Sequence, residues 1–495
     1  MRTQLPSSLF LRGLSLALLA VCAPAHADDD GHLLLSRSVY PGTGSSPYAP
    51  PVIVPGKTAL PGGGTAVADG TYPNVFLNAG PDGSFGVTSP IYVDVLSTSG
   101  HTERTIPIDV TKVVTSFSSK SEIALNLTPR GNAVTFMAYV APVSALDVSN
   151  SNTPSHVDPT NPVAESYQRA VVQLGPHGLK VMPVNGYSGN NGRAVLLAKN
   201  GRYYMSGNAG NGGNPQPASI IDDTGVLMIP AGGGPECTQV GTFSVTQEGF
   251  AADKLGKDSN FRGLATFGDT LYVTKGSGGN GIDTVYQVGT KDALPTQAVS
   301  DNPNQAGNPT NMSILPGFPT QLAKSQPGAN GAGYFPFGIW FADANTLYVA
   351  DEGDSTAADA GVSAYAGLQK WTFANGTWSL AYVLQGGLGL GQQYTVSGLP
   401  AAIDPATDGL RNIAGRHNED GTVTLYAITS TVSASGDQGA DPNRLVTITD
   451  RLSYTTATQA SQEQFRVLKT AGYGEVLRGV AVVNGEDEGG DGGDD

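Results

Sequence analysis

The chain has 495 residues and a formal net charge of −15 at pH 7, because 42 acidic side chains outnumber 27 Lys and Arg. This balance excludes nucleic acid as a partner, since neutralising phosphates takes clustered basic residues and the sequence has no such cluster. The 66 Gly and 33 Pro make up one fifth of the chain, which favours β structure rich in turns.

The first 27 residues have the features of a secretory signal peptide. Arg2 and Arg12 precede an apolar run at 14–21, and residues 25–27 have the small-x-small form that signal peptidase cuts. We expect the mature chain to start at Asp28 and to be secreted or periplasmic. No later stretch reaches the roughly 18 apolar residues needed to span a bilayer, so no membrane span is expected.

The two cysteines bear on export and on stability. Residues 19–22 resemble a lipobox, so a lipoprotein anchored at Cys22 is the alternative, although Val21 stands where a small residue is expected. Cys237 is the other cysteine, so the mature chain can form no intrachain disulfide. Its stability must come from a large core.

Three segments, 261–276, 335–353 and 410–429, repeat one pattern: a short apolar strand, a polar turn and a second strand containing Leu-Tyr. Their wide spacing excludes a solenoid and predicts the blades of a β-propeller, an all-β fold of four-stranded antiparallel sheets. The tyrosines in the three copies, Tyr272, Tyr348 and Tyr426, are predicted to be buried between blades.

Following the repeat outward predicts seven blades, with six or eight left open. The residues that precede each expected inner strand are Pro73, Lys120, Arg193, Arg262, Phe337, Arg411 and Arg478. The strand at 32–36 is expected to complete the last blade, so that the two ends of the chain close the ring. The propeller should occupy 28–484, followed by a disordered acidic, Gly-rich tail at 485–495.

Long inserts follow the second strand of several blades, at 142–163, 207–217, 275–283, 351–367 and 431–443. Because they leave equivalent strands, they should rise on one face of the propeller. Long loops gathered on one face commonly form a binding surface.

The segment 345–353, Asn-Thr-Leu-Tyr-Val-Ala-Asp-Glu-Gly, resembles the repeats of the YVTN-type and NHL-type propellers, with weaker echoes at 269–275 and 422–429. That group includes lactonases, lyases, electron-transfer domains and binding scaffolds, so the resemblance implies the fold and no particular activity. The long inserts, and the Arg-Gly pairs at inner-strand starts, depart from its short regular repeats.

Four arginines occupy equivalent positions at the entry to inner strands, so they should converge near the axis on the long-loop face. Such a group could bind a small anion through bidentate hydrogen bonds. Alternatively, each arginine pairs with an Asp or a backbone carbonyl of the neighbouring blade and only fastens the ring. The four are Arg193, Arg262, Arg411 and Arg478.

Asp351, Glu352 and Asp354 leave a second strand on the same face. Asp351 and Glu352 are candidates for a general acid/base pair, and Asp351 and Asp354 are candidate ligands for Ca²⁺. Asp283 is a further candidate, because 278–286 matches a calcium nonapeptide pattern. Alternatively, these carboxylates cap turns and neutralise the arginines.

No His pair has zinc-ligand spacing, and neither a Gly-x-Ser-x-Gly elbow nor a phosphate-binding Gly-Lys-Ser/Thr loop occurs. Two functions remain. The first is a monomeric exported propeller that binds a small anion, a glycan or a protein partner on its long-loop face. The alternative is a propeller hydrolase or lyase, with or without Ca²⁺, that acts on an ester, a lactone or an acidic sugar.

Overall fold

The computed structural model describes residues 31–40, 87–299, 311–326, 333–399, 401–433 and 439–483, apart from positions 118, 146, 231–232 and 253 within these ranges. The predicted signal peptide with Cys22, the position at Pro73 and the acidic tail lie outside the described residues. Within these ranges, no helix is long and apolar enough to cross a membrane.

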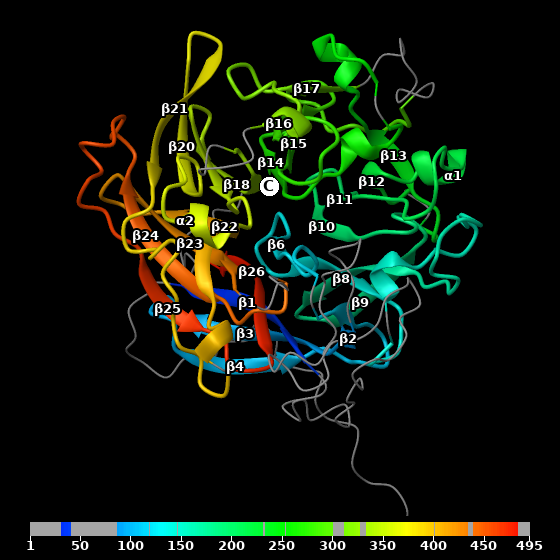
Figure 1. Ribbon diagram of the computed structural model, residues 1–495, viewed down its shortest axis with the longest axis horizontal. Helices are drawn as coiled ribbons and strands as arrows, with labels where there is room; N and C mark the ends of the chain where they lie inside the picture. Colours follow the sequence, from blue (N-terminus) through cyan, green and yellow to red (C-terminus); the bar gives the residue numbers. More distant parts are fainter. Residues whose placement is uncertain are drawn as a thin grey trace, which may run out of the picture.

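Six four-stranded antiparallel sheets surround a central axis in the described part of the chain (Figure 1). In order from the axis outward, blade 1 has β26 (Glu475–Val483), β1 (His32–Val39), β3 (Ile91–Ser97) and β4 (Thr102–Pro107); blade 2 has β6 (Asn126–Leu127), β7 (Val134–Tyr139), β8 (Arg169–Gly175) and β9 (Gly178–Val184); and blade 3 has β10 (Gly192–Leu197), β11 (Tyr203–Gly207), β12 (Gly225–Met228) and β13 (Thr238–Gly241).

Blade 4 has β14 (Leu264–Phe267), β15 (Thr270–Lys275), β16 (Thr284–Val288) and β17 (Met312–Ile314); blade 5 has β18 (Pro336–Asp343), β19 (Thr346–Asp351), β20 (Gly367–Ala374) and β21 (Thr377–Leu384); and blade 6 has β22 (Ala406–His417), β23 (Thr422–Val432), β24 (Arg444–Arg451) and β25 (Arg466–Thr470). A small sheet of β2 (Thr88–Ser89) and β5 (Thr115–Ser116), and two short helices, α1 (Ala218–Ile221) and α2 (Ala357–Ala360), lie outside the blades.

The prediction of a propeller of four-stranded blades is confirmed, but the count of seven is wrong. Six of the seven positions do precede inner strands or lie within them: Lys120, Arg193, Arg262, Phe337, Arg411 and Arg478. The seventh, at Pro73, was placed between the first two strands that the structure shows. Because β1 pairs directly with β3 in blade 1, no further blade lies between them in the ring.

The closure of the ring by the two ends of the chain is confirmed. β1 pairs antiparallel with β26, from His32 opposite Val483 to Val39 opposite Glu475. The innermost strand of blade 1 is therefore the last strand of the described chain, while the other three strands come from its beginning. This arrangement leaves no unpaired sheet edge where the ring closes.

Hydroxyl groups on second strands fasten each of four blades to the next one. Ser36 donates to the carbonyl oxygen of Ile123 at 2.6 Å, and Thr135 donates to that of Val195 at 2.8 Å. Ser206 likewise donates to Arg262 O at 2.8 Å, and Thr274 donates to Phe337 O. These bonds satisfy buried inner-strand carbonyls whose ladder is open on the side of the axis.

The glycines near the starts of inner strands are required there for a steric reason. A Cβ on Gly263 would lie 2.1 Å from the carbonyl oxygen of Phe337 in blade 5, and one on Gly338 would lie 2.4 Å from that of Arg411 in blade 6. Six inner strands crowd around the axis, so only glycine permits this approach. The glycine of the Arg-Gly pair therefore serves packing, whatever its arginine does.

The tyrosines of the three clearest repeats are buried, as predicted. Tyr272, Tyr348 and Tyr426 have exposed fractions of 7%, 0% and 1%. Tyr348 also donates a hydrogen bond to Asp450 in blade 6. They belong to the apolar layers between adjacent blades, where most of the core lies.

The long connections follow second strands in blades 2 to 6, at 140–168, 208–224, 276–283, 352–366 and 433–443. Equivalent strands run in the same direction in a propeller, so these connections emerge on one face. The turn between β22 and β23, which follows His417, is on the opposite face.

Candidate functional site

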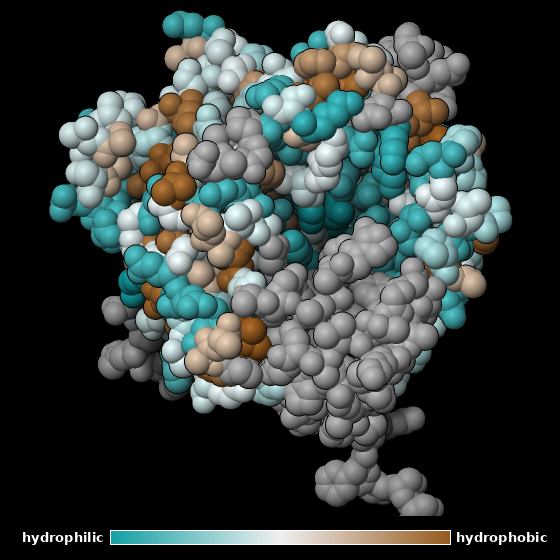
Figure 2. Space-filling view, in the orientation of Figure 1, coloured by the Kyte–Doolittle hydropathy of each residue, from teal (hydrophilic) through white to brown (hydrophobic). Residues whose placement is uncertain are grey.

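The four predicted arginines lie at the entries to the inner strands of blades 3, 4, 6 and 1, at the end of the axis where the long connections emerge. Lys120 and Phe337 hold the equivalent positions in blades 2 and 5. The order around the axis is therefore Arg478, Lys120, Arg193, Arg262, Phe337 and Arg411. Figure 2 shows a hollow lined by hydrophilic side chains near the centre of the ring.

Arg193 and Arg478 donate to groups of neighbouring blades. The guanidinium of Arg193 lies 2.9 Å from the carbonyl oxygen of Phe261 and also contacts the side chain of Asn260. Arg478 donates to the carbonyl oxygens of Phe117 and Gly439, the latter at 2.8 Å. Both arginines are buried. These contacts match the alternative reading, in which an arginine fastens adjacent blades.

Arg411 forms an ion pair with Glu352 of blade 5, with Nε 3.0 Å from the carboxylate oxygen, and both side chains are buried. Burial raises the pKa of Glu352, but the positive charges of Arg262 and Arg411 outweigh it and lower the pKa overall. Glu352 is therefore an anion at neutral pH that neutralises part of the cationic group, and the paired state disfavours it as a proton-transfer residue.

Arg262 differs from the other three, because it is half-buried and its hydrogen bonds go to the hydroxyl groups of Ser277 and Ser121. Its guanidinium carbon lies 5.5 Å from the centre of the Phe337 ring. Among the described residues, no carboxylate forms an ion pair with it. Burial is the main cause that lowers its pKa; Glu352 acts against this and Arg411 with it.

Arg193, Arg262, Arg411 and Lys120 form one electrostatic group with the carboxylates of Glu352 and Glu122. Arg193 has its pKa lowered well below the usual value, first by burial and then by the charge of Arg262. The structure therefore brings three of the four predicted arginines close enough to affect one another. Arg262 is the member that is only half-buried and whose guanidinium donates only to serine hydroxyls.

Asp351 lies beside this group and is fully buried. Its carboxylate accepts hydrogen bonds from the backbone of Phe335 at 2.7 Å and Gly353 at 3.0 Å, and from Gln369 at 3.2 Å. Burial raises its pKa to about 7, although the two backbone hydrogen bonds act in the opposite direction. A carboxyl group that titrates near neutrality is suited to general acid/base chemistry.

Sequence reasoning missed Asp408, which follows Ala406 and Thr407 in the inner strand of blade 6. It is buried and accepts a hydrogen bond from the backbone of Ser355 at 2.9 Å. Burial raises its pKa to about 8, and the charges of Asp354 and Glu352 add to the rise. A carboxylate three residues before Arg411 was the available signal. Only the folded chain places it beside the loop that carries Asp354.

The candidate calcium ligands do not converge. Asp283 pairs with Lys275 at 2.7 Å and accepts from Gln326 at 2.9 Å. Asp354 accepts from the backbone of Thr356 at 2.9 Å, in an exposed turn. Across the described ranges, no group of three or more His, Cys, Asp or Glu could hold a metal ion. Calcium binding stays a prediction, without a ligand set to carry it.

No family model matches the chain, and no curated protein matches it. Solved structures that resemble it include a protein of unknown function from Bacteroides caccae, with 10% identity and a TM-score of 0.35 over 81% of this chain and 97% of that chain. The sialidase of Trypanosoma rangeli has 9% identity and a TM-score of 0.31 over 78% of this chain and 55% of that chain. An ulvan lyase has 9% identity and a TM-score of 0.33 over 79% of this chain and 88% of that chain. Likenesses this distant assign no function to the chain.

Proposed function

We propose that this protein is an exported propeller that binds a small anion or an acidic glycan at the axial end where the long connections emerge. The observation that carries the proposal is Arg262, a half-buried guanidinium in the axial group whose hydrogen-bond partners are serine hydroxyls. Arg193, Arg411 and Glu352 are already engaged, so they set the local potential while Arg262 supplies the contact.

The physical argument is one of charge balance. Arg193 and Arg262 have no carboxylate partner among the described residues, while Glu352 pairs with Arg411. Burial is the main cause that lowers the pKa of Arg193, and the charge of Arg262 adds to it, so holding these cations together in a buried region is costly. A bound anion would relieve this cost, and a ligand carboxylate or sulfate could accept two hydrogen bonds from Arg262.

The test is a calorimetric titration of the purified protein with a panel of dicarboxylates, inorganic sulfate and uronic acids. Arg262→Ala should weaken the best ligand about tenfold or more, because a charge-assisted hydrogen bond contributes about 1.5 to 3 kcal/mol. Arg262→Lys keeps the charge but loses the bidentate geometry, so it should retain part of the affinity. Arg130→Ala, an exposed site on the turn before β7, is the matched control. Unchanged affinity in Arg262→Ala contradicts the proposal.

A second candidate function is a hydrolase or lyase acting on an ester, a lactone or an acidic sugar. It is favoured by Asp351 and Asp408, two buried carboxyl groups whose pKa values are raised to about 7 and about 8. In this reading Arg262 holds the acidic group of the substrate and Asp351 transfers the proton. Turnover of such a substrate that is lost in Asp351→Asn would favour this candidate over binding alone.

A further inference from the structure

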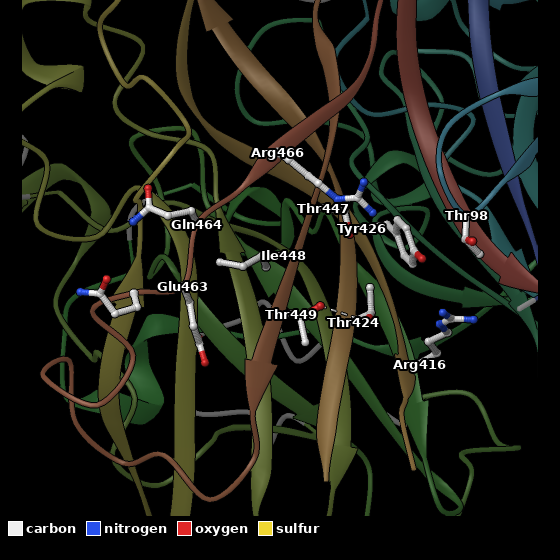
Figure 3. A pocket seen from close by; sticks show the side chains of 11 residues that line it. Thr98, Arg416, Thr424, Tyr426, Thr447, Ile448, Thr449, Glu463, Gln464 and Arg466 are labelled. Carbon is white, nitrogen blue, oxygen red and sulfur yellow. Dashed lines mark hydrogen bonds between the residues drawn. The ribbon is translucent and has the colours of Figure 1, made fainter. Parts of the chain in front are cut away.

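A pocket of about 440 Å³ lies between blades 6 and 1, at the end of the ring opposite the axial arginines (Figure 3). Arg416, near the end of β22, forms one wall, and Thr98, on the turn between β3 and β4, closes another. β22 carries Arg411 in its middle and Arg416 near its end, and Arg411 is not among the residues that line the pocket, so the pocket is separate from the axial group.

The register of blade 6 explains why the pocket exists. On the face toward blade 1, the pair Ile428 and Leu445 is buried against leucines of that blade. The next pair along is Tyr426 with Thr447, and the last is Thr424 with Thr449. The interface between blades 6 and 1 therefore changes from apolar to polar along these three pairs. At its polar end, the side chains leave a space where the two blades diverge.

The pocket is rich in hydrogen-bond donors. Arg466, at the start of β25, is exposed, and its side chain has neither a hydrogen bond nor an ion pair with any of the described residues, while its backbone pairs with Thr447. Figure 3 shows Arg466 and Arg416 on one side of the pocket, with Glu463 and Gln464 on the other. Thr424 and Thr449, 3.3 Å apart at their hydroxyl oxygens, lie between them.

Glu463 adds little negative charge at neutral pH. One of its carboxyl oxygens accepts a hydrogen bond from the backbone of Arg451 at 3.1 Å, and the other is buried. Burial is the main cause that raises its pKa, and the buried carboxylate of Asp450 adds to the rise. Two guanidinium groups and a largely protonated carboxyl group therefore give the pocket a positive charge.

We propose that this pocket is a second binding site, which takes a short acidic saccharide. The carboxylate or sulfate of the ligand contacts Arg416 and Arg466, while its hydroxyl groups exchange hydrogen bonds with the threonines and with Gln464. A volume of about 440 Å³ is within the ordinary range of small-ligand pockets, about 300 to 1,000 Å³. The two ends of the pocket differ in charge, which orients the ligand.

The experiment is a calorimetric titration in an Arg262→Ala background, so that the axial group does not contribute. The probes are digalacturonate, a sulfated disaccharide and neutral cellobiose. Digalacturonate or the sulfated disaccharide should bind at least about tenfold more tightly than cellobiose, since charge-assisted contacts are stronger than neutral ones. Adding Arg466→Ala should weaken that binding by about tenfold or more. Which acidic probe binds better distinguishes carboxylate from sulfate.

Two further variants make the outcome decisive. Arg466 is exposed, so Arg466→Ala should leave the melting temperature unchanged, and Thr449→Val should weaken binding without changing its charge dependence. Arg130→Ala, an exposed site in blade 2 outside the pocket lining, should bind like the background. The proposal is overturned if Arg466→Ala and Thr449→Val both bind as well as the background. It is also overturned if no acidic probe binds at up to about 1 mM, a concentration that would reveal even weak sites.

Discussion

Blades 5 and 6 hold two buried groups of charges that differ in balance. Between the blades, Lys370 and Asp450 are fully buried 2.8 Å apart, and Tyr348 and Tyr382 also donate to the Asp450 carboxylate. At the axis, Arg411 and Glu352 form a similar pair, but Arg193 and Arg262 lie close by without an ion-pair partner among the described residues, and of the carboxylates only Glu352 and Glu122 act on both of them. The first group is satisfied internally. The second has cationic capacity to spare, which is what a ligand site needs.

Breaking the balanced group should have the largest effect on stability. Lys370→Met leaves the Asp450 carboxylate buried without its cation, and removing one partner of a buried pair typically costs about 3 to 5 kcal/mol. We expect a loss of that size in the free energy of unfolding, measured by urea denaturation. Lys469→Met is the control, because Lys469 is partly exposed and lies 3.7 Å from Asp94, so about 1 kcal/mol or less is expected. Equal losses in the two variants would contradict the comparison.

Two variants in the axial group should affect stability and ligand binding differently. Arg411→Ala removes the partner of buried Glu352 and should lower the free energy of unfolding by about 3 kcal/mol. Arg262→Ala removes only hydroxyl contacts and relieves repulsion, so about 1 kcal/mol or less should be lost, while anion affinity falls. Thermal and urea denaturation of both variants measure this. A larger destabilisation from Arg262→Ala than from Arg411→Ala would show that Arg262 is the structural member.

A smaller, pH-dependent effect is expected at a third charged group. The ring nitrogens of His156 lie 3.0 Å from Asp223 and 2.7 Å from Glu236. The contact with Asp223 is the largest cause that raises the pKa of His156 to about 9, while burial acts against it. For Asp223, in contrast, burial raises the pKa, and the contact with His156 offsets only part of that rise. The pair is thus held together by the protonated ring.

The sign of the pH effect follows from the folded pKa of His156, which lies above the unfolded value of about 6.5. The stability that the protonated His156 ring contributes is fully present below about pH 6.5 and is lost as the pH rises through about 9. We expect the free energy of unfolding to decline over this window more steeply in the wild type than in His156→Gln. Urea denaturation at several pH values measures the two slopes. Parallel slopes would mean that another group titrates there.

Much of the architecture was predictable because it is local. Alternating apolar residues and the Leu-Tyr repeat identify strands, and their spacing predicts four-stranded blades. The six positions from Lys120 to Arg478 each precede or lie in an inner strand, and the predicted pairing of 32–36 with the last strand was correct. The blade count was wrong because sequence pattern cannot show that β1 pairs directly with β3.

The candidate site was predictable in part, for the same reason. Equivalent repeat positions place the arginines at one end of the axis, which the sequence alone determined. Which arginine is engaged depends on contacts between distant residues, such as Arg262 with Ser121 and Arg411 with Glu352. The raised pKa of Asp408 likewise depends on burial beneath a loop of another blade.

Sequence pattern by itself therefore determined the fold class, the segment that holds each described inner strand and the closure of the ring, because strand periodicity and repeat equivalence are properties of short segments. Only the tertiary structure decided the number of blades, the division of the arginines into structural and available ones, and the pocket between blades 6 and 1. Those features depend on burial and on which groups meet across blade interfaces, where neighbours come from residues far apart in the chain.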